Sequence, residues 1–120
     1  MFTILAYSLA LIAVMIFTFG VHETGHVMAI LFTHAGRLKG IVVSWKGIGI
    51  KWEPYAYEPL KRAAVSLAGP AVNMALAVLF YSVGLELLGL ANLVFGVVNL
   101  MPLPGSDGLR VASNLSSALS

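Results

Sequence analysis

The sequence contains no cysteine, and only 10% of its 120 residues are charged. Without cysteine, disulfide bonds and thiolate zinc sites are excluded, and the redox compartment stays open. The net charge of +2 is too small to indicate nucleic-acid binding. A soluble domain of this size could not bury a composition that is 59% hydrophobic. We therefore expect one α-helical integral membrane domain, residues 1–120, with the lipid bilayer as its partner.

The first apolar segment carries a metal-binding pattern. No charged residue occurs in the first 20 positions, and the apolar run predicts a transmembrane helix over residues 3–32, about 45 Å long. Within it, His22, Glu23 and His26 share one helical face. Two such imidazoles can bind one zinc ion, and the carboxylate between them can transfer a proton. The pattern also arises by chance, but a charge at mid-bilayer costs about 2.5–3.5 kcal/mol and is rarely retained without a partner or a function.

Residues 40–53 alternate between apolar and polar side chains, as in a half-buried pair of β-strands. A hairpin with Lys46 and Gly47 in a two-residue loop places three apolar pairs opposite one another: Trp45 with Ile48, Val43 with Ile50, and Ile41 with Trp52. All six side chains then share one face, which predicts a β-hairpin lying on or dipping into the membrane surface. An interfacial loop anchored by aromatic side chains is the alternative.

Pro59 opens a second apolar segment, residues 60–88, which predicts a second transmembrane helix. Its small residues between 66 and 73 permit close approach of another helix, and Pro70 is expected to kink the chain. Asn73 lies in this apolar stretch and needs hydrogen-bond partners. An interhelical hydrogen bond and a catalytic role are both open for it.

The third apolar segment, residues 90–101, is too short to cross a bilayer alone. It ends at Pro102 and Pro104, which cannot continue a helix, and irregular backbone at membrane depth persists only where protein or a wet cavity covers it. A short helix over residues 107–119 is expected to follow. Asp107, directly after this break, is the expected third metal ligand, and an N-cap of the following helix is its alternative role.

The basic residues all fall on one side of the predicted membrane. Six of the seven lie between the first segment and the start of the second, and the seventh follows the third segment: Arg37, Lys39, Lys46, Lys51, Lys61, Arg62 and Arg110. The positive-inside rule makes that side cytoplasmic, so the N-terminus is outside while the hairpin loop and the C-terminus are cytoplasmic. His26 and Asp107 are each expected about 10 Å below the cytoplasmic surface, which places the site near that face.

Three motifs together resemble the site-2 protease family of intramembrane zinc metalloproteases. They are His22-Glu23-Thr24-Gly25-His26, Ala68-Gly69-Pro70-x-x-Asn73 and Asn99-x-x-Pro102-x-Pro104-x-x-Asp107-Gly108. The chain looks like a minimal core, because the additional helices and PDZ insertion of many members are missing. Ser106 stands where members commonly carry leucine. The resemblance implies a fold of three transmembrane segments, the third broken at Pro-x-Pro, with a membrane-associated β-hairpin.

The resemblance also implies an activity, which is hydrolysis of peptide bonds in transmembrane protein substrates. His22, His26 and Asp107 would bind one zinc ion per chain, and Glu23 would be the catalytic acid/base. Asn73 and Asn99 would lie near the substrate or the developing oxyanion. The substrate is expected to add as a strand to the hairpin edge, at Val43, Trp45, Ile48 and Ile50.

Two other functions remain open from the sequence. The first is a non-catalytic metal-binding membrane scaffold or sensor, although such a site has no need of Glu23. The second is a transporter subunit, since broken helices and buried carboxylates also mark transporters, but the chain has no internal repeat. Nothing in the sequence indicates an oligomeric state.

Overall fold

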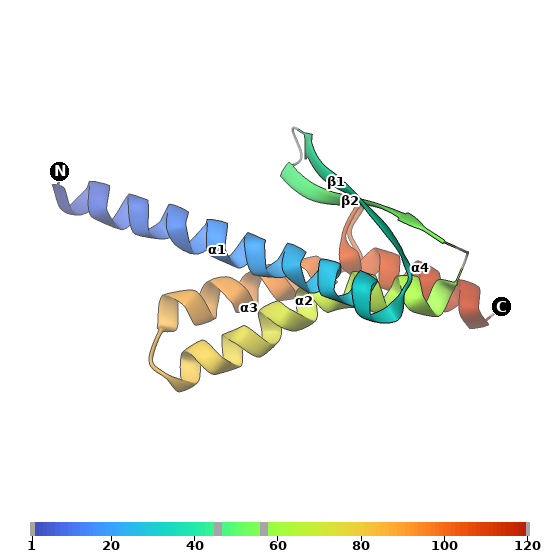
Figure 1. The fold of residues 1–120 in the computed structure, drawn as a ribbon. Helices are drawn as coiled ribbons and strands as arrows, with labels where there is room; N and C mark the ends of the chain where they lie inside the picture. Colours follow the sequence, from blue (N-terminus) through green and yellow to red (C-terminus); the bar gives the residue numbers. More distant parts are fainter. Residues whose placement is uncertain (1, 45–46, 56–57, 120) are drawn as a thin grey trace.

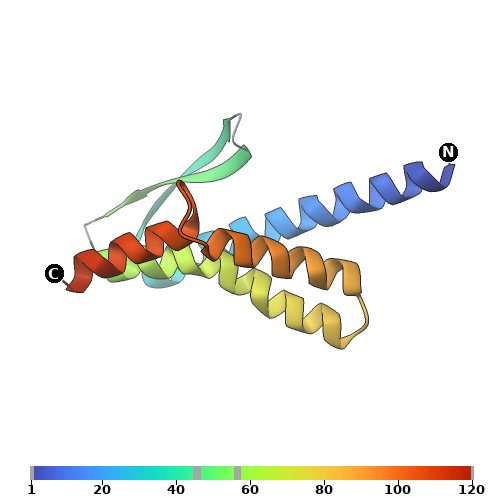
Figure 2. The same cartoon turned by 180° about the vertical axis from the view of Figure 1, so that it is seen from behind.

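A computed structural model describes residues 2–44, 47–55 and 58–119, which form four helices and one two-stranded antiparallel sheet (Figure 1). In chain order the elements are α1 (Phe2–Thr33), β1 (Gly36–Ser44), β2 (Gly47–Pro54), α2 (Pro59–Ser82), α3 (Glu86–Leu100) and α4 (Asp107–Leu119). α2 packs against the other three helices, and α4 continues in the direction of α3 (Figure 2). The expectation of a mostly helical protein with a small β-hairpin is therefore confirmed.

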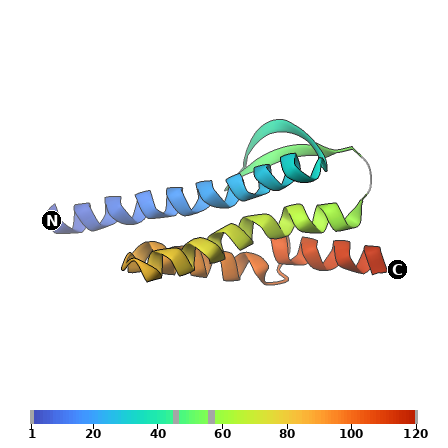
Figure 3. The same cartoon turned by 60° about the horizontal axis from the view of Figure 1, so that its bottom comes forward.

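α1 and α2 are long and apolar enough to cross a membrane, by length and composition. α3 is apolar but has only 15 residues, so it spans about 22 Å at about 1.5 Å per residue. α1 extends well past the turn that joins α2 to α3 (Figure 3). Nearly all side chains in its first half are exposed, as Tyr7 at 74% and Ile16 at 68% illustrate.

The second half of α1 packs closely against α2. The buried side chains Thr18, His22 and Ile30 recur at multiples of four residues, which places them on one face of the helix. Beside them, a Cβ added at Gly25 would come within 2.7 Å of the Ala68 carbonyl oxygen in α2. Small residues of this kind let helices associate in lipid, where burial of apolar surface contributes little. This contact holds the histidines of α1 against the middle of α2.

The predicted helix over residues 60–88 was wrong at its C-terminal end, because α2 ends at Ser82 and α3 begins at Glu86. Gly84 has a φ of +82°, and the Leu85 and Gly84 N–H groups donate to the carbonyls of Phe80 and Tyr81. This is the Schellman arrangement that commonly ends a helix at glycine.

Gly89, where the sequence suggested the helix stop, is instead inside α3 and buried. A Cβ there would lie 2.9 Å from the Tyr81 ring, so this glycine serves close packing of α3 on α2. The two glycines are indistinguishable by type. Only their three-dimensional surroundings separate a turn residue from a packing residue.

The break between α3 and α4 places Asp107 at the first position of α4, close to the predicted boundary. The Ser106 hydroxyl accepts from the N–H groups of Leu109 and Leu103, each at 3.1 Å, and donates to the Met101 carbonyl at 2.6 Å. Ser106 is therefore the N-cap of α4, and the alternative N-cap role of Asp107 is excluded. Because Ser106 caps the helix, the Asp107 carboxylate is available for other contacts.

The hairpin has the predicted strands but a different register. Ser44 faces Gly47, so Val43 lies opposite Ile48 and Ile41 lies opposite Ile50. The predicted pairings of Val43 with Ile50 and of Ile41 with Trp52 were each wrong by two positions. The expected pair of Trp45 with Ile48 was also wrong, because Ile48 lies opposite Val43; Trp45 itself lies outside the described part of the chain. A shift of two preserves the face of every side chain, so the apolar alternation could not distinguish the two registers.

A β-bulge near the base of the hairpin explains the partner of Trp52. The register shifts between Leu38 and Gly40, where Gly40 has a φ of +149°, and Leu38 becomes the residue opposite Trp52. Trp52 packs against the buried cluster of Ile30, Ala35 and Val65. This contact anchors the base of the hairpin to α1 and α2.

An ion pair joins the two strands on the other side of the base. Lys39 Nζ lies 3.0 Å from Glu53 Oε2, and the hydrogen bond from Lys39 lowers the pKa of the Glu53 carboxyl. Arg37 Nη2 lies 3.9 Å from the same oxygen. These side chains are largely exposed, so the ion pairs contribute little to holding the two strands together.

Candidate metal centre

Three potential ligand atoms from two distant segments converge at one point. His22 Nε2 lies 2.8 Å from Asp107 Oδ2, His26 Nε2 lies 3.3 Å from the same oxygen, and the two Nε2 atoms are 3.1 Å apart. In a tetrahedral zinc site with bonds of about 2.0–2.1 Å, neighbouring ligand atoms are about 3.3–3.4 Å apart. The three distances observed here are therefore close to the distances between ligand atoms in such a site.

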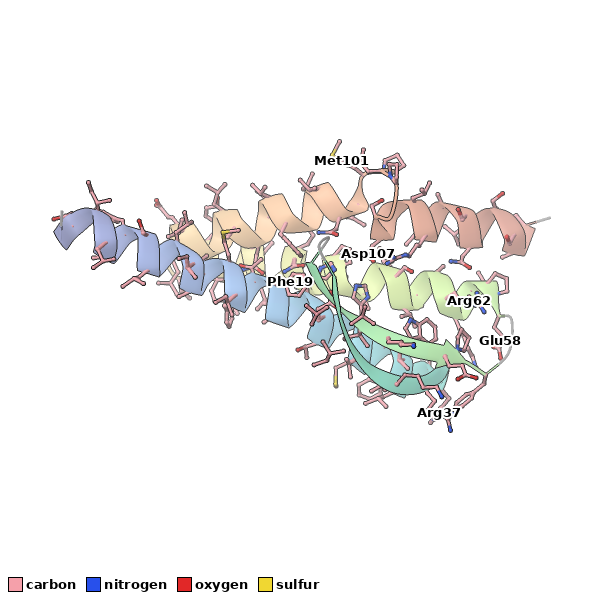
Figure 4. The ribbon with its side chains drawn as sticks, turned by 90° about the horizontal axis from the view of Figure 1, so that it is seen from above. Phe19, Arg37, Glu58, Arg62, Met101 and Asp107 are labelled. Atoms are coloured by element: carbon pink, nitrogen blue, oxygen red, sulfur yellow. The ribbon has the colours of Figure 1, made fainter. Side chains whose placement is uncertain are left out.

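Helix geometry and the chain break bring these atoms together. His22 and His26 are one turn apart on α1, and Asp107 reaches them because α4 starts beside that turn, with its carboxylate pointing into the bundle (Figure 4). His22 and Asp107 are 3% and 4% exposed. Groups of this kind are rarely buried among apolar helices unless they are paired or coordinate an ion.

The imidazoles present their Nε2 lone pairs to one another. His26 Nδ1 lies 2.6 Å from the Val65 carbonyl oxygen, and His22 Nδ1 lies 2.7 Å from Asn73 Oδ1. A carbonyl oxygen only accepts, so each Nδ1 carries the proton and each Nε2 is left as an electron-pair donor. Two such nitrogens and a carboxylate oxygen facing one another repel unless a proton or a metal ion lies between them. This donor set fits a zinc ion.

A glycine on α2 leaves space beside these atoms. A Cβ added at Gly69 would come within 2.5 Å of His26 Nε2 and 2.9 Å of His22 Cε1. Any larger residue at this position would push the imidazoles apart or occupy the space around Nε2. The residues present therefore fit a metal ion both in donor chemistry and in available volume.

Arg110 holds the remaining oxygen of the aspartate. Its Nη1 lies 3.3 Å from Asp107 Oδ1, one turn along α4, while Oδ2 faces the histidines. The guanidinium thus engages one carboxylate oxygen and leaves the other for the centre. This arrangement favours a ligand that binds through a single oxygen.

Glu23 lies next to the convergence point without joining it. Its carboxylate and the imidazoles of His22 and His26 have ligand atoms within 4.8 Å of one another, a group that can hold a metal ion. Glu23 is half-buried and lines a cavity of about 770 Å³, which His22, His26 and Asp107 also line. The carboxylate therefore faces the space that a reacting molecule would occupy.

Of the two asparagines expected near a substrate, only Asn99 lines this cavity. Its Nδ2 donates to the Phe95 carbonyl at 2.8 Å. Asn73 is fully buried, and its contacts are with His22, the Thr18 carbonyl and Asn92. These contacts assign Asn73 to holding His22 from behind, the interhelical role that the sequence left open.

Asn92 was not identified from the sequence, although it is fully buried and bonds to Asn73 at 2.8 Å. The signal was present, because an amide in an apolar helix needs partners. A search for a second amide that could satisfy Asn73 would have found it.

The hairpin covers the cavity with part of β2. Ile50, Gly49 and Trp52 line it, and the main-chain amide of Ile50 faces the Glu23 carboxylate. Val43 is 74% exposed. Of the other two residues expected at the edge, Trp45 lies outside the described residues, and Ile48 is described only through its place in β2. The side of β2 at Ile50 is therefore the part of the predicted edge that meets the site.

Comparison with known proteins adds no identification. No protein-family model matches the chain, and no curated protein matches it either. A group that can hold a metal and two helices that can span a membrane are what the structure itself supports. The resemblance to site-2 proteases rests on the three sequence motifs.

Proposed function

We propose that this protein is an intramembrane zinc metalloprotease that cleaves peptide bonds in or near the transmembrane segments of other proteins. The observation that carries the proposal is the convergence of His22 Nε2, His26 Nε2 and Asp107 Oδ2 within 2.8–3.3 Å of one another. Glu23 in the adjoining cavity supports catalysis over mere binding. The three motifs shared with site-2 proteases support the same reaction.

We propose three membrane crossings, made by α1, by α2, and by α3 continued into α4. The short length of α3 supports this, because about 22 Å is less than the roughly 30 Å of a hydrocarbon core and puts the break at membrane depth. The basic residues of the hairpin, α2 and α4 support a cytoplasmic location for that end of the bundle. The N-terminus is then outside, and the site lies near the cytoplasmic face.

In the proposed reaction Glu23 moves the protons. When bound, zinc supplies a Lewis acid for the scissile carbonyl and lowers the pKa of a water molecule toward neutrality. Glu23 accepts a proton from the attacking water and delivers it to the leaving amine. The Asn99 amide has a second N–H beyond the one donated to Phe95, and it is the candidate donor to the developing oxyanion.

A helical substrate must unwind before its carbonyls can react. We propose that the unwound stretch adds to β2 as an extended strand, on the side where Ile50 meets Glu23. Strand addition would hold the scissile bond along the cavity wall. In strand addition the main-chain N–H and C=O groups at the edge of β2 would bind the substrate whatever its sequence. Selectivity would then come from the surfaces that its alternate side chains contact.

The decisive experiment uses the full chain purified in detergent. We expect about one zinc per chain by elemental analysis and cleavage of a single-span membrane protein. Glu23→Gln should keep the zinc and abolish cleavage, whereas Asp107→Ala should lose the zinc. Glu86→Gln, which removes an exposed carboxylate at the start of α3, is the matched control and should retain both.

Two outcomes would overturn parts of the proposal. Normal cleavage by Glu23→Gln would remove the acid/base assignment. A wild-type chain that binds zinc but cleaves none of a panel of single-span substrates would favour the non-catalytic scaffold.

A further inference from the structure

A line of buried hydrogen bonds connects α3 to the metal centre. Asn92 Nδ2 donates to the Leu88 carbonyl at 2.9 Å, and Asn92 Oδ1 accepts from Asn73 Nδ2 at 2.8 Å. Asn73 Nδ2 also donates to the Thr18 carbonyl at 3.2 Å, and its Oδ1 lies 2.7 Å from His22 Nδ1. Both amides are 0% exposed. The line therefore crosses three helices without contact with solvent.

Main-chain carbonyls at two points determine the direction of every bond in this line. The Leu88 carbonyl can only accept, so Asn92 must turn its NH₂ group toward it and its oxygen toward Asn73. The Thr18 carbonyl and the Asn92 oxygen are then two acceptors on one side of Asn73. Asn73 must present its NH₂ group to them and its oxygen to His22. A reversed Asn73 would place its oxygen against two other oxygens.

The consequence reaches the ligand atom of His22. With an oxygen beside Nδ1, that nitrogen must carry a proton, so in the neutral ring Nε2 is the lone-pair donor toward Asp107 and His26. His26 obtains the same tautomer directly from the Val65 carbonyl. His22 alone depends on side-chain amides, which can reverse.

We propose that Asn92 is a positioning residue of the metal centre, acting through Asn73 to hold His22 in the tautomer that binds zinc. The inference deepens the proposed function and rests on the metal site within it. Asn92 touches neither metal nor substrate, and its effect passes through one amide. Removing it takes away one of the two acceptors that orient Asn73 and leaves the Thr18 carbonyl as the other. The tautomer should then become mixed rather than inverted.

The test is Asn92→Leu in the full chain, with zinc affinity measured by competition against a chelator. We expect the affinity to fall by about 10-fold to 100-fold, the usual range for loss of a group that orients a metal ligand. In the metal-free protein, nitrogen NMR of His22 should change from a single Nδ1-protonated form to a mixture. A role in packing alone would not change the tautomer.

Two further variants make the result specific. Asn92→Ser, whose hydroxyl can donate to the Leu88 carbonyl and accept from Asn73, should restore part of the affinity and serves as the test if Asn92→Leu does not fold. Val94→Ala truncates a side chain in the same helix that is 52% exposed and lies outside the cavity lining. It should leave zinc affinity unchanged.

Wild-type zinc affinity and an unmixed His22 tautomer in Asn92→Leu would overturn the inference. An equal loss of affinity in Val94→Ala would also overturn it, because the effect would then belong to α3 in general. Failure of the proposed proteolysis is distinguishable, since neither readout uses cleavage. If the wild type bound no zinc, the tautomer measurement on the metal-free chain would still decide the relation between Asn92 and His22.

Discussion

Both ends of α1 are rich in apolar residues, but their surroundings differ. From Thr18 onward, side chains pack against α2 and α3 through glycine contacts and buried hydrogen bonds. Before that point the side chains are large, apolar and mostly exposed. Hydrophobicity therefore does not distinguish the packed end, which we call the metal end, from the outer end. Small and polar residues do, as expected where lipid competes equally for apolar surface.

The largest effect is expected from adding a single methyl group at the metal end, where the helices pack closely. Gly69→Ala would place a Cβ 2.5 Å from His26 Nε2, and zinc affinity should fall by about 100-fold or more because the ligand atoms can no longer converge. Chelator competition measures the change. Gly20→Ala is the matched control, because a Cβ there would meet nothing within 4 Å. Equal affinity in the two variants would refute the assigned role of Gly69.

A second test separates the hairpin from the helices at the same end. Ile50→Pro removes the main-chain N–H that faces Glu23. Cleavage of a single-span substrate should fall by about 10-fold or more through misplacement of the substrate, while zinc content stays within about twofold, since no ligand atom moves. Ile50→Ala keeps the N–H and should retain most of the cleavage. Parallel loss of zinc and cleavage would mean that the hairpin only supports the fold.

The cap of α4 should produce a smaller effect. Ser106→Ala removes the acceptor of the Leu109 N–H, which should cost about 1 kcal/mol of stability and lower zinc affinity modestly through Asp107. Thermal unfolding in detergent and chelator competition measure both changes. The comparison at the outer end is Ser8→Ala, whose hydroxyl bonds only to the Ile4 carbonyl in its own helix. A Ser106→Ala chain as stable as Ser8→Ala would contradict the capping role.

The smallest effect is expected at the outer end itself. Ile12→Ala truncates a side chain that is 53% exposed, and unfolding free energy should change by less than about 0.5 kcal/mol, as for surface positions elsewhere. Zinc affinity should be unchanged. A loss of unfolding free energy as large as that for truncating a buried side chain would show that this half of α1 is packed against protein. The contrast between the two ends would then disappear.

Much of the site could be read from the order of residues along the chain. The spacing of His22 and His26 requires a shared helical face wherever the helix lies. Asp107 was identifiable because the Pro-x-Pro break is a local event that prevents α3 from continuing. The two long apolar helices were recognisable because long apolar runs leave few other structures possible.

The errors arose where partners come from distant parts of the chain. Gly84 and Gly89 are alike in sequence, yet one ends α2 and the other packs against Tyr81. The hairpin register was misjudged because two registers place the same side chains on the same face. For Asn73 the sequence left an interhelical and a catalytic role open, because the interhelical partner, Asn92, lies 19 residues away in another helix.

The sequence by itself determined that two imidazoles and a carboxylate share a helix face, and that an aspartate follows a broken helix. The repeat of the α-helix and the missing N–H of proline act within a few residues, so no fold is needed to know them. Only the tertiary structure decided which atoms converge, which nitrogen of each histidine carries the proton, and whether a glycine forms a turn or permits close packing. Those properties depend on how the helices are rotated and spaced against one another, and contacts between distant residues set that arrangement.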